Sequence, residues 1–189
     1  MEGVALRKSK TTKLILCALF AALTAVGAFI RIPIPVVPFT LQFLFTMLAG
    51  LLLGGKLGCV SVTVYIFMGL LGLPVFAEGG GFSYVLKPSF GYIIGFAVAA
   101  YVTGRIANQT PNPGYQRLLA ATFAGLFTVY LFGMVYYYII SAFYLGSPIG
   151  LWPLFVYCFV LAVPGDIVLC LIGSVLGKRL IPLIQKERA

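Results

Sequence analysis

Charged residues are scarce in this sequence, and histidine is absent. Only 9% of the 189 residues are charged, whereas 61% are hydrophobic. A soluble domain carries about 25% charged residues, so this composition excludes a soluble fold and indicates an integral membrane protein. The absence of histidine also removes the side chain that most often acts as a general base in enzymes.

Several sequence signatures of chemistry are missing as well. No GxxxxGK[ST] phosphate-binding loop occurs, so the chain cannot by itself energise transport with ATP. Cys17, Cys59, Cys158 and Cys170 fall singly within apolar runs and lack the spacing of metal ligands. We therefore expect no metal, no bound cofactor and no enzymatic activity. The formal net charge is +9, but the cations do not form one patch, so no nucleic-acid partner is expected.

Long hydrophobic segments occur six times along the chain. We predict membrane helices over residues 14–30, 39–53, 57–72, 90–105, 118–145 and 151–176. Pro33, Pro35 and Pro38 exclude a regular helix between the first two segments, and Pro164-Gly165 is expected to bend the last one. The sequence therefore predicts one all-α integral membrane domain that covers residues 1–189, with six transmembrane helices.

The positive charges predict the orientation of this domain. Six spans place both chain ends on one side of the membrane, and eleven of the thirteen Lys and Arg residues then fall on that side. Only Arg31 and Lys87 fall on the other side. Because positively charged loops stay in the cytoplasm, we predict that both termini are cytoplasmic, with residues 1–13 forming a basic N-terminus. The expected location is the cell membrane, where lipid surrounds the helices.

The loop of residues 74–90 is the most unusual stretch, and the predicted orientation places it outside. It contains Glu78, Lys87 and the consecutive glycines of residues 79–81. Three glycines disfavour a helix or an ordinary strand, and they let the backbone approach a ligand closely. We interpret this loop as a substrate-binding loop that becomes ordered when ligand binds. An exposed connector is the alternative.

A few polar residues within or beside the hydrophobic segments are candidates for ligand contact. Asp166 is the only acidic residue inside a predicted span, and a carboxylate at membrane depth is costly enough to suggest a ligand or ion path. The alternative is a carboxylate satisfied by a neighbouring lysine or tyrosine. Lys87 suits an anionic ligand group or a lipid headgroup, and Gln42 can both donate and accept hydrogen bonds.

The first hydrophobic segment carries small residues at four-residue intervals, among them Ala18 and Ala22. This spacing places a smooth groove on one face of a helix, where another helix can approach closely. The groove serves either a partner protein or packing within the domain.

Three motifs in a fixed order resemble one known family. VVPFTLQ at 36–42, GLPVFAEGGGF at 72–82 and KPSFGYIIGF at 87–96 are together similar to the BioY family, and the likeness extends over nearly the whole chain. Members of that family are biotin-binding S components of energy-coupling factor (ECF) vitamin transporters. The resemblance implies a six-helix protein that binds biotin near its outer face.

The resemblance also implies partners and binding residues. The expected partners are biotin, a transmembrane T component that contacts Ala18 and Ala22, and two cytoplasmic ATPases, which alone use ATP. The motifs and the predicted topology imply a substrate site made of Gln42, Phe76, Gly80, Gly81, Lys87, Tyr92 and Asp166. On chemical grounds, we assign Asp166 to a ureido N–H of biotin and Lys87 to its carboxylate. Aromatic rings, including Phe82 and Phe90, are expected to cover the apolar ring system.

Other functions are compatible with the same residues. An S component for another vitamin shares the six-helix plan but differs in its pocket. A solitary secondary transporter would use Asp166 to couple transport to protons. A membrane enzyme is the least favoured, because a single buried carboxylate lacks a partner nucleophile.

Overall fold

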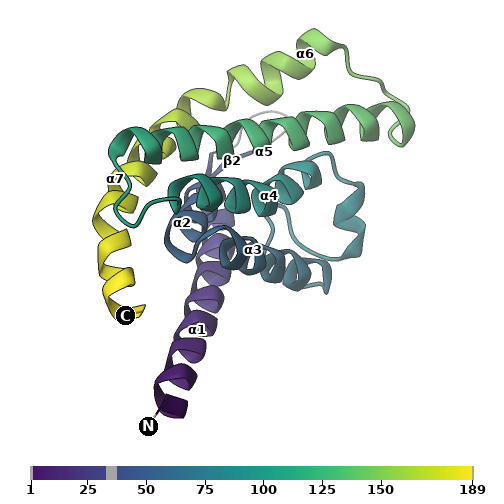
Figure 1. Cartoon of the computed structure of the whole chain (residues 1–189). Coiled ribbons are helices and arrows are strands. Elements are labelled where there is room, and N and C mark those ends of the chain that lie inside the picture. The colour runs from purple at the N-terminus through teal and green to yellow at the C-terminus, as the bar shows by residue number, and fades with distance from the viewer. Residues whose placement is uncertain (1, 33–37, 189) are drawn as a thin grey trace.

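The chain forms a bundle of α-helices with very little strand structure. The computed structural model describes the backbone of residues 2–32 and 38–188, and the side chains of residues 10–32 and 38–183. Its long helices are α1 Glu2–Phe29, α2 Gln42–Leu53, α3 Gly55–Leu70, α4 Phe90–Ala107, α5 Tyr115–Phe143 and α7 Val163–Arg188. Figure 1 shows α3, α4 and α5 side by side, with α1 at a steep angle to them and both termini toward the same side of the view. Helix α1 packs against α2 and α3.

Short elements connect these helices at one end of the bundle. Strands β1 Arg31–Ile32 and β2 Phe39–Thr40 pair in antiparallel fashion between α1 and α2. The 3₁₀-helix η1 Phe82–Leu86 lies between α3 and α4, and the short helix α6 Leu151–Phe155 leads into the π-helix η2 Val156–Val160 before α7.

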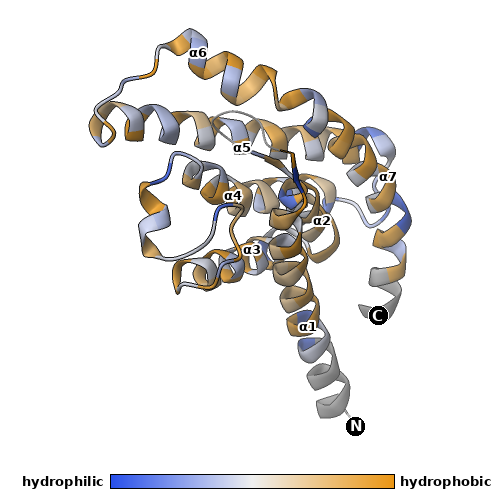
Figure 2. Ribbon diagram, turned by 180° about the vertical axis from the view of Figure 1, so that it is seen from behind, coloured by the Kyte–Doolittle hydropathy of each residue, from blue (hydrophilic) through white to orange (hydrophobic). Residues whose placement is uncertain are grey.

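Within the described residues, four segments are long and apolar enough to cross a membrane. They are Lys10–Phe29, Phe90–Ala107, Tyr115–Phe143 and Leu151–Leu183, the last of which runs through α6, η2 and most of α7. The apolar helices α2 and α3 are shorter, at 12 and 16 residues. Large apolar side chains such as Leu14, Phe127 and Trp152 are about 70% exposed, and Figure 2 shows that hydrophobic residues occur along most of the helices. A surface of this kind suits lipid rather than water, so the chain is a multi-pass membrane protein.

Several helix boundaries differ from the predicted ones, and two of the differences have a clear structural reason. The first helix begins at Glu2 rather than at residue 14, because most of the basic N-terminal stretch continues the same helix. The second helix begins at Gln42 rather than at residue 39, because Phe39 and Thr40 pair with β1 instead. The predicted effect of Pro33 and Pro35 falls outside the described residues.

The last predicted helix is interrupted earlier than expected. The sequence predicts one helix bent at Pro164-Gly165, but the regular pattern already ends in the π-helix η2 and a turn at residues 161–162. Proline lacks an N–H, and its ring collides with the carbonyl four residues before it. Pro164 therefore lies in the first turn of α7, where an amide N–H has no partner within the helix, and the distortion falls on the residues before it.

Glycines let α4 lie very close to its neighbours. A side chain at Gly50 of α2 would collide with the carbonyl oxygen of Ala100 in α4. A Cβ atom at Gly95 would lie 3.0 Å from the Cα atom of Val129 in α5. This close packing fixes α4 between α2 and α5, and so fixes the positions of Tyr92 and Phe96 on its inner face.

Candidate functional site

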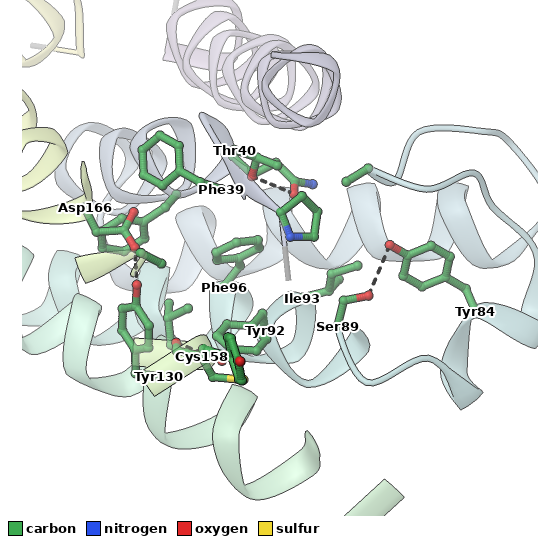
Figure 3. Close-up of a pocket in the computed structure, with 17 residues that line it drawn as sticks. Phe39, Thr40, Tyr84, Ser89, Tyr92, Ile93, Phe96, Tyr130, Cys158 and Asp166 are labelled. Atoms are coloured by element: carbon green, nitrogen blue, oxygen red, sulfur yellow. Dashed lines mark hydrogen bonds between the residues drawn. The ribbon is translucent and has the colours of Figure 1, made fainter. Parts of the chain in front are cut away.

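Several elements meet around one narrow cavity at the end of the bundle where the outer loops are predicted (Figure 3). The cavity is small, with a volume of about 60 Å³. Its wall contains residues of β2 and α2, the loop before α4, α4 itself, α5, η2 and α7. They are Pro38, Phe39, Thr40, Gln42, Phe43, Ala77, Tyr84, Ser89, Tyr92, Ile93, Phe96, Val129, Tyr130, Tyr157, Cys158, Ala162 and Asp166. A ligand of appreciable size would have to displace some of these side chains.

A hydrogen-bonded pair of Asp166 and Tyr130 occupies one end of the cavity (Figure 3). The Tyr130 hydroxyl donates to Oδ2 of Asp166 at 2.5 Å, and the Asp166 side chain is 8% exposed. The carboxylate lies in the first turn of α7, where the helix dipole favours negative charge. Among the described side chains, Tyr130 is the only one that hydrogen-bonds it, and no cation pairs with it. Its other oxygen is therefore available to a donor from a ligand.

The break before α7 determines where the next polar group lies. In a regular helix the amide of Ala162 would donate to the carbonyl of Cys158, but here it donates to Phe159 at 3.2 Å. The Cys158 carbonyl instead accepts from the hydroxyl of Tyr92 at 3.3 Å. The irregular backbone of η2 is thus tied to α4 by a cavity residue.

Gln42 joins the cavity to the neighbouring loop through a chain of hydrogen bonds. Thr40 Oγ1 donates to Gln42 Oε1 at 3.1 Å, and Gln42 Nε2 donates to the hydroxyl of Tyr65. That hydroxyl in turn donates to the carbonyl of Val75 at 3.3 Å. Gln42 is 3% exposed, so its amide is oriented by partners rather than by solvent.

The loop between α3 and α4 closes the opposite end of the cavity. Ala77, Tyr84 and Ser89 contribute to its wall, and Ser89 Oγ donates to the Tyr84 hydroxyl at 3.4 Å (Figure 3). Burial raises the pKa of the Tyr84 phenol above its usual value, so this ring remains neutral. Arg31 of β1 donates to the carbonyl of Ala77, which attaches the loop to the first strand.

The predicted substrate residues fall into two groups. Gln42, Tyr92 and Asp166 line the cavity together. The other four, Phe76, Gly80, Gly81 and Lys87, do not line it.

The residues outside the wall have other contacts in the loop. The Phe76 ring is 1% exposed and packs edge-on against Tyr65, where it anchors the loop. Gly81 donates its backbone N–H to the carbonyl of Gly69 at 2.7 Å, and a side chain at Gly80 would collide with the backbone of Leu73. These two glycines allow the backbone of the loop to pack closely against the end of α3.

The charged end of Lys87 has its own partners in this conformation. Its Nζ atom lies 3.1 Å from Oε2 of Glu78 and 4.9 Å from the centre of the Tyr84 ring. The two remaining predicted aromatic residues, Phe82 and Phe90, also lie outside the wall. Phe82 is 77% exposed, whereas Phe90 packs edge-on against Tyr136.

Sequence reasoning missed several residues of the wall, above all Tyr130. The partner of a buried carboxylate was foreseen as a lysine or tyrosine, but its identity depends on how α5 lies against α7. Cys158 stood out only as a cysteine within an apolar run, and its backbone carbonyl carries no sequence signal. Ser89 and Tyr84 lie within the loop of residues 74–90, which the sequence predicts to bind the substrate. The sequence does not distinguish these two residues, which line the cavity, from Lys87, which does not.

The alanines of the first helix lie on two different faces. Ala18 and Ala22 are exposed, whereas Ala21, Ala25 and Ala28 are buried against the rest of the bundle. The surface that contains Ala18 and Ala22 is therefore accessible from outside the domain, and its use by a partner remains a prediction.

The chain is similar to known proteins along nearly all of its length. The BioY family profile matches residues 4–186. A probable biotin transporter BioY of Lysinibacillus sphaericus is 44% identical over 184 residues, which cover 97% of this chain and 94% of that protein. The biotin transporter BioY of Thermotoga maritima is 41% identical over 123 residues, 65% of this chain and 72% of that one.

The fold has a counterpart among solved structures as well. The S component for biotin from an ECF-type ABC transporter superimposes with a TM-score of 0.73 at 27% identity, over 92% of each chain. The profile match and the long alignment with the Lysinibacillus protein lead to one conclusion: this chain belongs to the BioY family.

Proposed function

We propose that this protein is the biotin-binding S component of an ECF-type transporter, which captures biotin at the outer face of the membrane. The observation that carries the proposal is the cavity, which holds Asp166 and Gln42 among aromatic side chains. Family membership and the likeness to a biotin S component support the same ligand. A concave, mostly apolar site with a few convergent polar groups is typical of small-molecule binding.

The chemistry of biotin matches the polarity of the two cavity ends. The ureido group offers two N–H donors, and the free oxygen of Asp166 can accept one of them in a charge-assisted hydrogen bond. Tyr92, Phe96 and Tyr130 present apolar ring surface to the fused rings. The valerate chain then extends toward Tyr84, whose ring lies 4.9 Å from the Lys87 amine.

We further propose six spans with both termini in the cytoplasm. Four segments are long enough by themselves, and α2 and α3 are apolar helices that complete the count. Lys13, Lys56 and Arg105 lie around one groove at the opposite end from the cavity, as the positive-inside rule predicts for a cytoplasmic face. Labelling with a membrane-impermeant thiol reagent should modify a cysteine placed at Glu78, but not one placed at Gln109, in intact cells. Labelling of the cysteine at position 109 but not of the one at position 78 would indicate the opposite orientation.

The proposed partners are a transmembrane T component and two cytoplasmic ATPases. Similarity to an S component of an ECF-type ABC transporter supports such an assembly in general. The exposed pair Ala18 and Ala22 is the proposed contact with the T component.

A cavity-filling substitution tests biotin capture directly. Ala162 lines the cavity and is half-buried, so Ala162→Phe should occupy the ligand space and abolish biotin binding in titration calorimetry. Ala120→Phe places the same ring at an exposed position of α5 and serves as the control, which should bind biotin normally. Equal affinity in the two variants would show that biotin does not bind in this cavity.

A further inference from the structure

Three cations from three different helices line one groove at the end of the bundle opposite the cavity. They are Lys13 of α1, Lys56 of α3 and Arg105 of α4, and all three side chains are exposed. The groove surrounds the turn at Gly54 and Gly55, which joins α2 to α3. The biotin cavity shares no residue with this groove.

No described carboxylate neutralises these cations. Glu78 forms the one ion pair among the described side chains, with Lys87, and Asp166 is bonded to Tyr130 in the cavity. The side chains of Glu2 and Glu187 lie outside the described part. Three like charges around one groove repel each other, so an anion that binds there gains favourable interaction with all three.

The backbone around the turn also favours an anion. The carbonyl oxygens at the end of α2, which would repel negative charge, accept hydrogen bonds from Asn108: its Nδ2 atom lies 3.1 Å from Leu51 O and 3.5 Å from Gly50 O. Gly54 has a φ of 85°, and a side chain at Gly104 would collide with the backbone of the turn. Gly104 therefore lets α4 and the turn approach each other closely, and Arg105 of α4 and Lys56 of α3 line the same groove.

Apolar surface continues from the groove along the same helices. Leu14 and Ile15, which follow Lys13 on α1, are 71% and 62% exposed, and Val60, one turn after Lys56 on α3, is 52% exposed. Tyr101 lies in the groove and is itself partly exposed, as aromatic residues at the membrane interface often are. An anionic lipid could therefore place its headgroup against the cations of the groove and its acyl chains against the exposed apolar side chains of α1 and α3.

We propose that this groove binds the phosphate of an anionic phospholipid, such as phosphatidylglycerol, through Lys13, Lys56 and Arg105. The inference rests on the proposed orientation, which puts the groove at the cytoplasmic leaflet, where anionic lipid attracts basic segments. Lipid bound here would join α1, α3 and α4 at their inner ends.

Native mass spectrometry of the purified protein tests the site with added phosphatidylglycerol and, separately, phosphatidylcholine. Phosphatidylglycerol should be retained preferentially. Lys13→Gln, Lys56→Gln and Arg105→Gln should each weaken its binding about fivefold, and the triple variant about a hundredfold. Arg179→Gln removes an exposed inner-end charge outside the groove and should leave binding nearly unchanged.

Three results would overturn the proposal. The first is equal retention of the two lipids, or equal loss in the groove variants and the Arg179 control. The second is full displacement of phosphatidylglycerol by millimolar inorganic phosphate, which would mean that the groove takes a free anion. The third is that the groove variants bind lipid normally but no longer co-purify with the T component, which would mean that the groove contacts a protein. The lipid measurements use purified protein and so do not depend on orientation, and biotin titration on the same samples reports the proposed function separately.

Discussion

At the scale of single residues, the buried carboxylate of Asp166 is the feature that needs an explanation. Tyr130 satisfies one of its oxygens at 2.5 Å, and no cation lies beside it among the described side chains. A carboxyl group at this depth with only a phenol as partner is costly, and ionisable residues inside a membrane usually mark a ligand or ion path. A ureido donor would complete its hydrogen bonding without a second charge.

Asp166→Asn removes the charge while it keeps the shape of the side chain. We expect biotin affinity to fall about thirtyfold, which corresponds to the loss of about 2 kcal/mol from one charge-assisted hydrogen bond. Tyr130→Phe removes only the phenol that orients the carboxylate, so its effect should be smaller, about fivefold. Titration calorimetry on both purified variants measures the difference. Unchanged affinity in the asparagine variant would disprove the assignment of Asp166 to the ligand.

The same variant separates the S component from a proton-coupled transporter. If Asp166 carried protons, asparagine would abolish uptake driven by a proton gradient, whereas biotin binding would survive. Uptake measured with and without an uncoupler, beside the calorimetry, distinguishes these outcomes.

Lys87 presents a different problem, because its charge is already paired with Glu78. That pair is about 40% exposed, and exposed ion pairs contribute only about 0–1 kcal/mol, so a ligand carboxylate can replace Glu78 at little cost. We expect Lys87→Gln to weaken biotin severalfold but to leave biotin methyl ester, which lacks the negative charge, unaffected. Glu78→Gln should bind biotin at least as tightly as the wild type. Equal losses for biotin and its ester would mean that Lys87 acts only through the loop.

At the scale of elements, hydrophobic runs predict where most helices lie but not how they are interrupted. The fourth helix was predicted at residues 90–105 and is α4 Phe90–Ala107, because an apolar run bounded by Pro88 and a polar connector leaves little choice. The sequence did not predict the π-helix η2. Pro164 indicates that the helix is distorted nearby, but it does not indicate which residues are distorted. That distortion frees the Cys158 carbonyl for Tyr92, so an error in one element concealed part of the site.

The candidate site was predictable where a residue is unusual in its own segment. Asp166 and Gln42 are polar residues among apolar ones, and both line the cavity. For Phe76 and Gly80, the sequence does not distinguish a loop that binds a ligand from a loop that packs against its own protein. In the structure both residues pack against the end of α3. The Tyr130 contact joins residues 36 positions apart, and a single sequence does not reveal such a pairing.

The loop between α3 and α4 is anchored at its first half and open at its second. Phe76 is fully buried, whereas Ser83 is exposed on η1 beside Tyr84. We expect a spin label on Ser83→Cys to become less mobile when biotin binds, because ligand contacts would hold Tyr84 and η1 in place. Cys59, the one native cysteine that is not buried, is replaced by serine in this experiment.

A label on Leu71→Cys, at the end of α3, is the control and should report the same mobility with and without biotin. If the Ser83 label is equally mobile in both states, the loop does not close on the ligand and the site is preformed.

At the scale of the whole molecule, the two ends of the bundle have different chemistry. One end holds the cavity and the loops that cover it, and the other holds Lys13, Lys56 and Arg105 around the inner groove. Between them, α1 buries one face of alanines and leaves another exposed. A helix that exposes small residues at regular intervals offers a second membrane protein a surface for close approach.

That exposed face of α1 leads to the final prediction, that Ala18→Trp and Ala22→Trp block assembly with the T component but leave biotin affinity nearly unchanged. Both positions are exposed, so the indole ring fits without disturbing the bundle, whereas it prevents a partner helix from approaching closely. Ala120→Trp places the same ring on the exposed face of α5 and should assemble normally. Co-purification of the T component with each variant, beside biotin titration, measures both properties. Intact complexes with the Ala18 and Ala22 variants would mean that this face contacts lipid, and the T component would then have to bind the protein through another surface.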